Sequence, residues 1–319
     1  MRAVVFYKYG GPEVLALKSI AKPLPRPFEV LIKVKASSIN SWDYELLKGT
    51  PFANRFMFGL FRPKKINILG SDLSGIVEEV GRNVTKFKPG DEVFGDQSGG
   101  NWGGFAEYTC AHENNLILKP TEISFEVASC LPQAGLLAFQ ALRDYAQVKT
   151  GQEALINGAG GGAGCFAIQL AKMYGAHVTA VDTKEKFEIM KELGADEVID
   201  FNREDYTKTG KYDIIIDNIA RRSFFDYKGA LKEDGIFGLV GGKGGTIFQI
   251  LILGAICGGN KKLKLVLHQA NKGLESLTNL VKEGKIKVIV DKTFNLDKTN
   301  EAFEHFAANQ FKGKIVVKP

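Results

Sequence analysis

Cysteine and histidine are scarce in this chain of 319 residues, which contains four of each. The cysteines are far apart and form no CxxC pair, which argues against a disulfide framework and against a thiolate-rich zinc module. The histidines are also scattered, so we expect each to be a packed or surface residue and not a metal ligand. The residues concerned are Cys110, Cys130, Cys165, Cys257, His112, His177, His268 and His305.

The chain also lacks a long hydrophobic run and a concentrated patch of charge. Its most apolar stretch, residues 247–257, is well short of the ~18 residues that a membrane-spanning helix needs. The apolar run at residues 1–6 is too short for a signal peptide. The net charge of +6 is spread out, and its densest cluster, residues 261–264, has no interleaved aromatic residues of the kind that bind nucleic acid. We therefore expect a soluble, cytoplasmic protein with no integral membrane segment and no nucleic-acid partner.

Glycine, in contrast, is abundant, at 36 residues, above the average usage of about 7%. Some of these glycines close short apolar runs between residue 1 and about residue 122. In one such run Val30, Ile32 and Val34 alternate with Lys33 and Lys35, which is the period-two pattern of a half-buried strand. Many short strands at close spacing predict a compact β-barrel.

From about residue 123 strand-like segments alternate with helix-like ones, which predicts an α/β fold with a doubly wound parallel sheet. Residues 263–268 are expected to supply a sixth strand of this sheet. The tail of the chain returns to the pattern of the first region. We therefore predict one domain from residues 1–122 and 269–319, and a second domain from residues 123–268.

The most informative local feature is the glycine-rich segment 158–164, which lies between a predicted strand and a predicted helix. The pyrophosphate of a dinucleotide requires main-chain N–H groups at close range and a helix N-terminus directed at it, and glycine permits that approach. The pattern predicts a dinucleotide-binding turn, and a glycine-rich loop without a ligand is the alternative. The residues assigned to this turn are Gly160, Gly161, Gly162, Ala163 and Gly164.

Asp182 ends the next predicted strand, where an acidic side chain can accept hydrogen bonds from both ribose hydroxyls of the adenosine half. This favours NAD(H), because a carboxylate repels the 2′-phosphate of NADP(H). Lys184 and Lys186 follow closely and could hold that phosphate, so the choice between the two cofactors stays open. Thr183 is assigned to the same site.

Asn218 and the pair Gly241 and Gly242 follow the fourth and fifth predicted strands of this sheet. Ligands of such sheets bind at the carboxyl ends of the strands. These three residues are therefore predicted to contact the nicotinamide.

Six segments occur in the order of a known family: residues 36–43 (ASSINSWD), 69–81 (LGSDLSGIVEEVG), 87–95 (FKPGDEVFG), 105–108 (FAEY), 155–164 (LINGAGGGAG) and 313–317 (GKIVV). Together they resemble the medium-chain dehydrogenase/reductase superfamily, in its zinc-free quinone oxidoreductase branch. The resemblance covers nearly the whole chain. It implies a GroES-like catalytic domain built from both chain ends, with a Rossmann dinucleotide-binding domain between them.

The same resemblance bears on metal chemistry. Zinc-dependent relatives carry a cysteine where this chain has Asn40 and a histidine where it has Ser71. They also carry a four-cysteine structural lobe, whereas residues 95–108 of this chain contain no cysteine. An amide and a hydroxyl do not replace soft zinc ligands, so the resemblance implies chemistry without zinc.

Without a metal, hydride transfer to an enone or quinone leaves negative charge on the carbonyl oxygen, and a polar donor must stabilise it. Asn40 and Asp43 occupy positions where the family places active-site polar groups, and the adjacent Tyr44 is a candidate proton donor. For all three the alternative is a structural turn after a strand, because Asn and Asp favour turns.

Two apolar segments have predicted roles. Phe52, Phe56, Phe58 and Phe61 fall where the family's substrate-cleft loop varies, and they are predicted to line a cleft for an apolar substrate. The alternative is a helix that packs these rings onto the barrel. Residues 247–257 fall where the superfamily often dimerises, which implies a homodimer, although they could equally be buried within their own chain.

We therefore predict a zinc-independent, NAD(P)H-dependent reductase that transfers hydride to quinones or α,β-unsaturated carbonyls. Two other functions remain open. One is an NAD(P)-dependent alcohol dehydrogenase, which Asn40 and Ser71 argue against. The other is a cofactor-binding redox sensor with little turnover, because a fold does not by itself determine activity.

Overall fold

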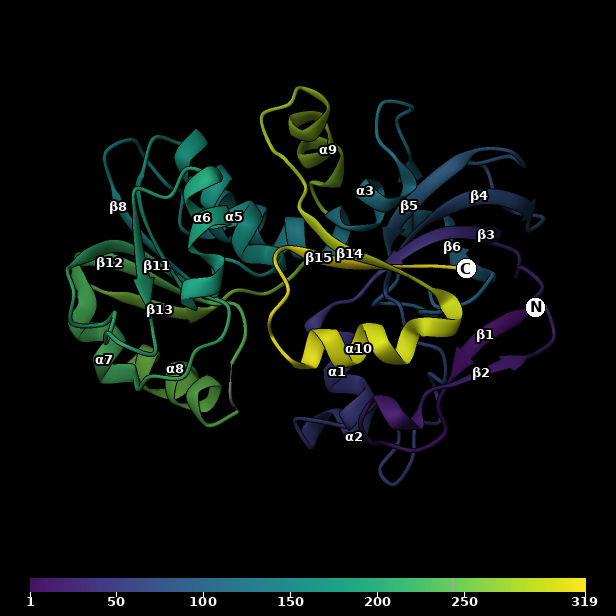
Figure 1. Cartoon of the computed structure of the whole chain (residues 1–319), viewed down its shortest axis with the longest axis horizontal. Helices are drawn as coiled ribbons and strands as arrows, with labels where there is room; N and C mark the ends of the chain where they lie inside the picture. Colours follow the sequence, from purple (N-terminus) through teal and green to yellow (C-terminus); the bar gives the residue numbers. More distant parts are fainter. Residues whose placement is uncertain (243) are drawn as a thin grey trace. The chain divides into compact units, whose positions relative to one another are not determined.

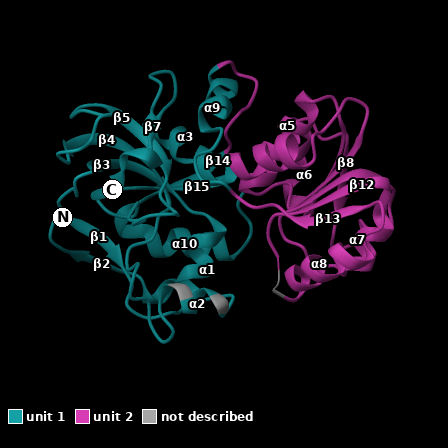
Figure 2. Ribbon diagram, turned by 180° about the vertical axis from the view of Figure 1, so that it is seen from behind, with its two compact units in different colours: residues 1–134, 269–282, 290–319 teal, residues 135–268, 283–289 magenta. Residues whose placement is uncertain are grey.

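The computed structural model describes residues 1–242 and 244–319, except for the side chains of residues 53, 57 and 244. The chain forms two compact units (Figure 2). Unit 1 comprises residues 1–134, 269–282 and 290–319, and unit 2 comprises residues 135–268 and 283–289. Both ends of the chain lie in unit 1 (Figure 1), so unit 2 is an insertion in the sequence of unit 1.

Unit 1 is built on a seven-stranded sheet in which β3 is central. Its strand order is β14-β15-β3-β4-β5-β7, with β6 also paired to β3, and β1 and β2 form a separate antiparallel pair. The strands are β1 (Arg2–Val5), β2 (Ala16–Ser19), β3 (Glu29–Ser38), β4 (Asp72–Val80), β5 (Glu92–Asp96), β6 (Tyr108–His112), β7 (Ile117–Leu118), β14 (Val290–Asn295) and β15 (Lys314–Lys318). The helices are α1 (Ser41–Lys48), α2 (Ala53–Phe58), α3 (Phe125–Ser129), α9 (Leu274–Lys282) and α10 (Thr299–Ala307).

The central position of β3 explains its burial. Val30 and Ile32 are fully buried, as their alternation with lysine predicts, but Leu31 on the opposite face is fully buried as well. At residues 30–32, β4 pairs with one edge of β3 and β6 with the other, so this part of the strand lies inside the sheet and has little contact with water. β3 ends at Ser38, and the chain turns at Asn40 into α1.

Unit 2 is a parallel six-stranded sheet with the order β10-β9-β8-β11-β12-β13. Along the chain, β9 and β10 are added on one side of β8, and β11, β12 and β13 are then added on its other side. The strand order thus reverses between β8 and β11, and their carboxyl ends form a topological switch point. Figure 1 shows α5 and α6 on one side of this sheet and α7 and α8 on the other. The strands are β8 (Glu153–Asn157), β9 (His177–Asp182), β10 (Glu197–Asp200), β11 (Tyr212–Asp217), β12 (Leu231–Leu239) and β13 (Lys262–Leu265). The helices are α4 (Leu136–Phe139), α5 (Gly162–Met173), α6 (Phe187–Glu192), α7 (Phe224–Ala230) and α8 (Gly244–Cys257).

The two units differ from the predicted domain bounds, 1–122 with 269–319 and 123–268, in two places. The sequence pattern changes near residue 123, but α3 contacts β3 and β4, so the chain leaves unit 1 only after residue 134. Residues 283–289 belong to unit 2, because the side chain of Gln169 on α5 makes two hydrogen bonds to the backbone of Lys287, at 2.7 and 2.9 Å. Contacts of this kind join residues far apart in the sequence and leave no local pattern.

Candidate active site

The glycine-rich turn lies at the carboxyl end of β8 and leads directly into α5. Gly158, at a φ of +73°, donates to the carbonyl of Val181 at 2.9 Å. Gly161 is the extended N-cap residue, and as a glycine it has no side chain with which to cap the helix. The backbone N–H groups of residues 162–164 therefore have no acceptor within the helix, because the first turn of a helix has no preceding carbonyl to bind. Residues 161–163 are only half-buried. The turn can present these donors to an anion.

Two glycines of this turn serve different purposes. A Cβ at Gly164 would lie 2.2 Å from the carbonyl oxygen of Gly158 and 2.5 Å from Cα of Ala159, so glycine is needed there for packing within the protein. A Cβ at Gly161 would meet its nearest protein atom at 3.5 Å, which is an ordinary contact. Packing therefore does not require glycine at residue 161, whereas the close approach of a pyrophosphate would. The turn fits the group that the sequence predicts.

Asp182 lies where the sequence predicts, at the end of β9, but its contacts are internal. The side chain is 1% exposed. One carboxylate oxygen accepts the N–H of Gly160 at 2.9 Å, and the other accepts the N–H of Thr183 at 2.9 Å. The Lys186 ammonium is 3.3 Å from the second oxygen and is itself 2% exposed. Asp182 and Lys186 thus form a buried ion pair that supports the glycine turn.

Asn218 and the two glycines predicted beside it lie close together. The Asn218 side chain donates to the carbonyl of Asn157 at 2.8 Å, which joins the ends of β8 and β11. A Cβ at Gly241 would lie 2.7 Å from the carbonyl oxygen of Asn218, and one at Gly242 would lie 2.8 Å from Cβ of Ala220. Glycine at both positions allows the loop after β12 to approach the loop after β11.

A cavity of about 200 Å³ opens at this switch point, and the sequence analysis did not identify it. Its walls come from the end of β8 and from the segments that follow β10 and β11. The strands β8 and β10 lie on either side of β9, which ends at Asp182. Two arginines, Arg221 and Arg222, line the cavity. The Arg222 guanidinium is 3.6 Å from the Asp205 carboxylate and about one-third exposed, at 36%. The remaining lining residues are Asn157, Phe201, Tyr206 and Ile219.

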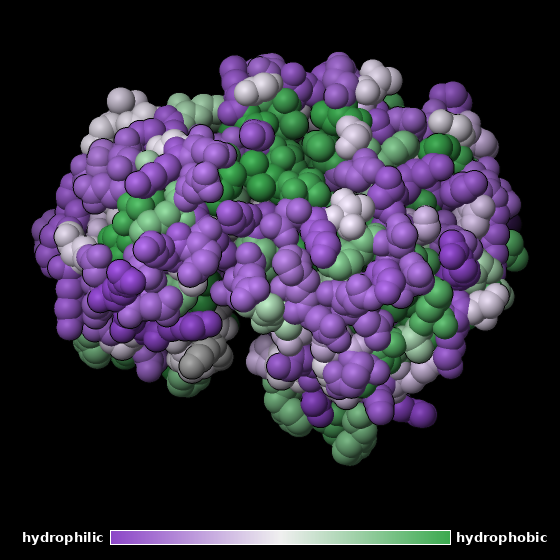
Figure 3. Space-filling model, in the orientation of Figure 1, coloured by the Kyte–Doolittle hydropathy of each residue, from purple (hydrophilic) through white to green (hydrophobic). Residues whose placement is uncertain are grey.

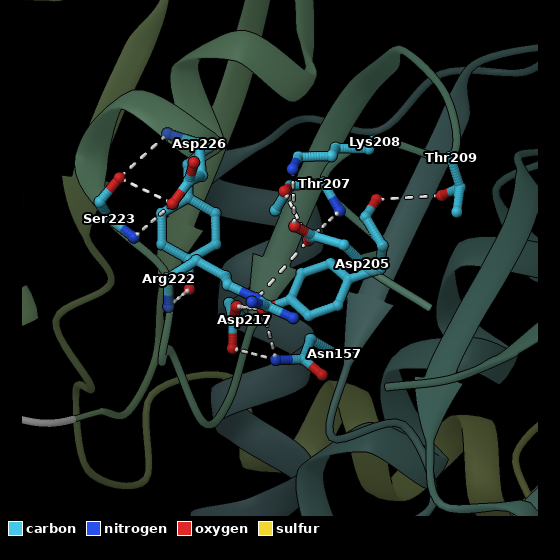
Figure 4. Close-up of polar contacts among 11 residues, drawn as sticks. Asn157, Asp205, Thr207, Lys208, Thr209, Asp217, Arg222, Ser223 and Asp226 are labelled. Carbon is cyan, nitrogen blue, oxygen red and sulfur yellow. Dashed lines mark hydrogen bonds and ion pairs between the residues drawn. The ribbon is translucent and has the colours of Figure 1, made fainter. Parts of the chain in front are cut away.

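A buried polar network forms the floor of this region (Figure 4). Asp217 is fully buried, and its carboxylate accepts hydrogen bonds from the Asn157 amide at 2.8 Å and the Tyr206 hydroxyl at 3.1 Å. It also accepts the N–H groups of Ile219 and Ala220 at 2.9 and 2.6 Å. Burial and the neighbouring Asp217 charge raise the pKa of Tyr206, so its hydroxyl remains protonated and donates to Asp217. The network fixes the loop that carries the two arginines.

In unit 1 the predicted catalytic residues lie at the turn between β3 and α1. Asn40 is 5% exposed and Asp43 is fully buried. The Asp43 carboxylate accepts the N–H of Asn40 at 2.8 Å and the N–H of Gly70 at 2.8 Å. Burial raises the pKa of Asp43 to about 6, and these hydrogen bonds limit the rise. Asp43 therefore ties the turn at Asn40 to the loop before β4.

A buried lysine that the sequence analysis did not single out lies at the same turn. Lys314, on β15, is 3% exposed. Its ammonium donates to the carbonyl of Ile39 at 3.0 Å and to the side-chain oxygen of Asn40. The Asn40 amide nitrogen is 3.4 Å from the hydroxyl of Ser71. The adjacent Asp72 is fully buried, and burial together with the nearby Asp96 raises its pKa.

The other predicted catalytic residue, Tyr44, packs against α10. Its ring lies 6.4 Å from that of Phe303 and 5.7 Å from that of Phe306, and the Lys48 ammonium is 5.2 Å from its centroid. The ring thus contributes to the core of unit 1, where it is partly buried.

The four predicted cleft phenylalanines separate into two groups. Phe58 is 9% exposed and packs into the core of unit 1. Phe52, Phe56 and Phe61 are 59%, 72% and 88% exposed, and the rings of Phe52 and Phe56 meet edge to face at 5.6 Å. Figure 3 shows hydrophobic side chains at the lower end of unit 1, around α2 and the loop after it. Three of the four rings are therefore available to a ligand.

The scarce cysteines and histidines do not gather. Within residues 1–242 and 244–319, no three His, Cys, Asp or Glu side chains are grouped so that they could hold a metal ion. His305 pairs with Asp291 at 2.6 Å, and His177 lies 3.0 Å from Glu153. Burial raises the pKa of the Cys130 thiol to about 12, so this cysteine is a neutral core residue at neutral pH.

Within the part of the chain that the structure describes, no helix has both the length and the apolar character needed to cross a membrane.

Arg221, Arg222 and Lys314 are the candidate functional residues that the sequence analysis missed. The arginines come three and four residues after Asn218, at a strand end already predicted to bind ligand. That position was a usable signal. Lys314 belongs to one of the six family-like segments, but nothing local indicates that residue 314 lies beside residue 40.

Comparison with known proteins agrees with this architecture. The model of the alcohol dehydrogenase GroES-like domain matches residues 26–121, and that of the zinc-binding dehydrogenases matches residues 193–317. A chloroplastic quinone-oxidoreductase, QR1, from Triphysaria versicolor is 34% identical, with 100% of this chain and 98% of that protein covered. A 2-methylene-furan-3-one reductase from Solanum lycopersicum is 31% identical over 100% of this chain and 79% of that protein. The solved structure of a quinone oxidoreductase from Coxiella burnetii has a TM-score of 0.90 and 33% identity, and it covers 100% of this chain and 99% of that one.

A glycine-rich turn at a topological switch point, carried in one chain with a GroES-like unit, is the architecture of a nucleotide-dependent oxidoreductase. The chain belongs to the medium-chain dehydrogenase/reductase superfamily, in its quinone oxidoreductase-like branch. The predicted fold class, a GroES-like β-barrel domain with a Rossmann doubly wound sheet, is confirmed, and so is the prediction of an NAD(P)H-dependent oxidoreductase.

Proposed function

We propose that this protein is a zinc-independent reductase that transfers hydride from NADPH to quinones or α,β-unsaturated carbonyls. The observation that carries the proposal is the buried group formed by Asn40, Ser71 and Lys314. An amide, a hydroxyl and an ammonium are poor ligands for zinc, and the positive charge of Lys314 would repel a metal ion bound at Asn40. The names of the Triphysaria and Solanum relatives support the two substrate classes.

The chemistry that the residues must supply is modest. The reduced nicotinamide provides the hydride when it is bound. Negative charge then develops on the carbonyl oxygen of the acceptor, and the Asn40 NH₂ group is the proposed donor to that oxygen. Asp43 holds the Asn40 turn in place through its two backbone hydrogen bonds. The exposed rings of Phe52, Phe56 and Phe61 are proposed to bind the apolar body of the acceptor.

The decisive experiment measures NADPH oxidation by the pure protein with a panel of quinones and enones, alongside NADPH formation with a panel of alcohols. We expect turnover with the first panel, none with the second, and no loss of rate after treatment with a zinc chelator. One zinc per chain in a metal analysis, together with chelator-sensitive alcohol oxidation, would establish an alcohol dehydrogenase instead. Tight NADPH binding without turnover would favour a redox sensor.

The contacts of Asp182 support NADPH as the cofactor. Asp182 is 1% exposed and both of its carboxylate oxygens have partners within the protein, so its side chain is not accessible to the ribose hydroxyls of NADH. The nearby cavity carries the cations Arg221 and Arg222, and guanidinium groups bind phosphate strongly. We therefore propose that these arginines bind the phosphorylated adenosine half.

Replacement of Arg222 tests this cofactor preference. Arg222→Leu should raise the Kd of NADPH about tenfold, the loss expected for one hydrogen bond to a charged group, with little effect on NADH. Arg203→Leu is the matched control, because Arg203 is 73% exposed and lies outside the cavity lining. Equal effects of Arg222→Leu on both cofactors, or tighter NADH binding by the wild type, would contradict the proposal.

We also propose a homodimer formed through unit 2. The helix α8 exposes Phe248, and Leu251, Ile252 and Ile256, which follow it three, four and eight residues later, lie along the same face. The terminal strand β13 lies beside this helix.

The proposed location is the cytoplasm. The described cysteines form no disulfide, which is consistent with a reducing compartment. Cell fractionation would test this location against an organelle.

A further inference from the structure

Lys314 is a lysine in a place where lysine is rarely found. Its side chain is almost completely buried, at 3% exposed, whereas lysines normally keep the ammonium in water. Burial of an ammonium is costly unless hydrogen bonds and nearby charge compensate for it. Here it donates to the carbonyl of Ile39 and to the side-chain oxygen of Asn40. The buried carboxylates of Asp43 and Asp72 are near enough to interact with its charge.

This contact fixes the orientation of the Asn40 amide. An ammonium carries only donors, so it can bind the oxygen of the amide but not its NH₂ group. With its oxygen held by Lys314, Asn40 must present its NH₂ group in the other direction. That group also lies beside the Asp72 carboxyl, whose pKa it lowers, and its contact to Ser71 is long at 3.4 Å. Of the two N–H bonds, the one directed at Ser71 therefore keeps donor capacity for another acceptor.

The charge on Lys314 also changes the strength of the donor. A hydrogen bond to the oxygen of an amide polarises the group, and the effect is larger where the surroundings are buried. The N–H bonds of Asn40 therefore become stronger donors when the ammonium is in place. A developing oxyanion is the kind of acceptor that benefits from such a donor.

We propose that Lys314 is a positioning residue for hydride transfer: its ammonium orients and polarises the Asn40 amide so that the NH₂ group faces the reacting oxygen. This inference rests on the proposed function, in which Asn40 is the donor. It explains why a charged residue is buried at the start of β15, where β15 passes the end of β3.

The test compares Lys314→Met, which has a similar volume but no charge, with Lys318→Met on the same strand, where the side chain is 45% exposed and pairs with Glu126. Lys314→Met should lower kcat for quinones and enones at least tenfold, the scale seen when a supporting hydrogen bond is removed. KM and the Kd of NADPH should change less than threefold, whereas a general loss of structure would alter both. Lys318→Met should behave as the wild type does. A folded Lys314→Met variant with kcat within twofold of the wild type would overturn the proposal.

A second variant separates this inference from the proposed function. Asn40→Asp keeps an acceptor for the Lys314 ammonium but removes the NH₂ donor, so it should fold and lose kcat to a similar extent. Full activity in Asn40→Asp would refute Asn40 as the donor, and the role of Lys314 with it, while the reductase activity itself would stand. Loss in Asn40→Asp combined with full activity in Lys314→Met would refute the role of Lys314 alone. A further measurement decides if Lys314→Met does not fold or if the wild type shows no turnover. In the wild type with isotope-labelled asparagine, the side-chain amide NMR signals of Asn40 should show one rigid orientation. Averaged signals would overturn the proposal.

Discussion

At the scale of single residues, buried charge distinguishes the candidate functional residues of each unit. In unit 1 it is carried by Asp43 and Lys314, and in unit 2 by the pair of Asp182 and Lys186. Each such group must be compensated by hydrogen bonds or an opposite charge, or it destabilises the fold. The compensating partners are backbone N–H groups and carbonyls of turns, so these charges hold turns in defined conformations. The turns they hold include Asn40 and the glycine-rich segment.

Asp43 gives a pH-dependent prediction. Its pKa in the folded protein is about 6, above the value of 3.8 for an unburied aspartate. Between these values the folded state binds more protons than the unfolded state, so lowering the pH from 7.5 to about 5 adds stability through this group. Asp43→Asn removes this pH-dependent contribution to the unfolding free energy. In urea unfolding, the difference in unfolding free energy between wild type and Asp43→Asn should therefore shift in favour of the wild type as the pH falls.

Asp91→Asn is the control for this measurement. Hydrogen bonds from Lys88 lower the pKa of Asp91, so its carboxylate stays ionised at pH 5 and its contribution is lost only at more acidic pH. Its unfolding free energy should therefore follow the wild type in parallel between pH 7.5 and 5. Parallel curves for Asp43→Asn as well would show that Asp43 titrates normally.

At the scale of elements, the junction of β8 and α5 contains one glycine that packing requires, Gly164, and one that we expect cofactor binding to require, Gly161. Gly164→Ala would place a methyl group against the backbone of residues 158 and 159 and should lower the unfolding free energy by about 1–3 kcal/mol, as overpacking does. Gly161→Ala has room within the protein. It should therefore leave stability nearly unchanged and raise the Kd of NADPH about tenfold, because its methyl group lies where the phosphates approach. Thermal unfolding and cofactor fluorescence measure the two effects.

Gly229→Ala in α7 controls for the effect of alanine itself. Its Cβ would have no neighbour within 4 Å, so stability should rise by up to about 1 kcal/mol and cofactor binding should not change. If Gly161→Ala binds NADPH with the affinity of the wild type, the phosphates of the cofactor do not bind beside residue 161.

The elements of the fold were largely predictable because their signals are local. The alternation in β3, the glycine turn and the acidic end of β9 are all visible within a few residues. What could not be predicted depends on pairing between distant segments. Asp182 has the sequence position of a ribose ligand, but its carboxylate binds the N–H of Gly160 and the ammonium of Lys186. These contacts depend on the folded conformation of the glycine-rich turn, which the sequence around Asp182 does not show. Lys314 is 274 residues from Asn40, and only the antiparallel pairing of β15 with β3 brings the two together.

At the scale of the whole molecule, the chain separates its tasks between two units. Unit 2 carries the proposed dinucleotide turn and the arginine-lined cavity, and unit 1 carries the Asn40 turn and the exposed phenylalanines. Unit 2 also contains residues 247–257, where the resemblance to the superfamily implies association between two copies. The structure buries Ile250 in the core and leaves the opposite face of α8 exposed.

The exposed face of α8 gives a prediction about assembly. Phe248 and Ile256 are 65% and 75% exposed, more than a monomeric protein usually leaves uncovered at neighbouring positions. We expect the wild type to sediment as a dimer in analytical ultracentrifugation at micromolar concentration. Ile256→Asp, which places a charge on the exposed face of α8, should sediment as a monomer and still bind NADPH.

Leu24→Asp serves as the control for this change, because Leu24 is 81% exposed but lies in unit 1. It should remain a dimer, which shows that the loss of association depends on the position of the charge and not on added charge alone. Ile256→Asp should also be more soluble than the wild type at low concentration if the dimer dissociates there, since the monomer no longer exposes an uninterrupted apolar face. A monomeric wild type, or a dimeric Ile256→Asp variant, would mean that α8 is not the contact between copies.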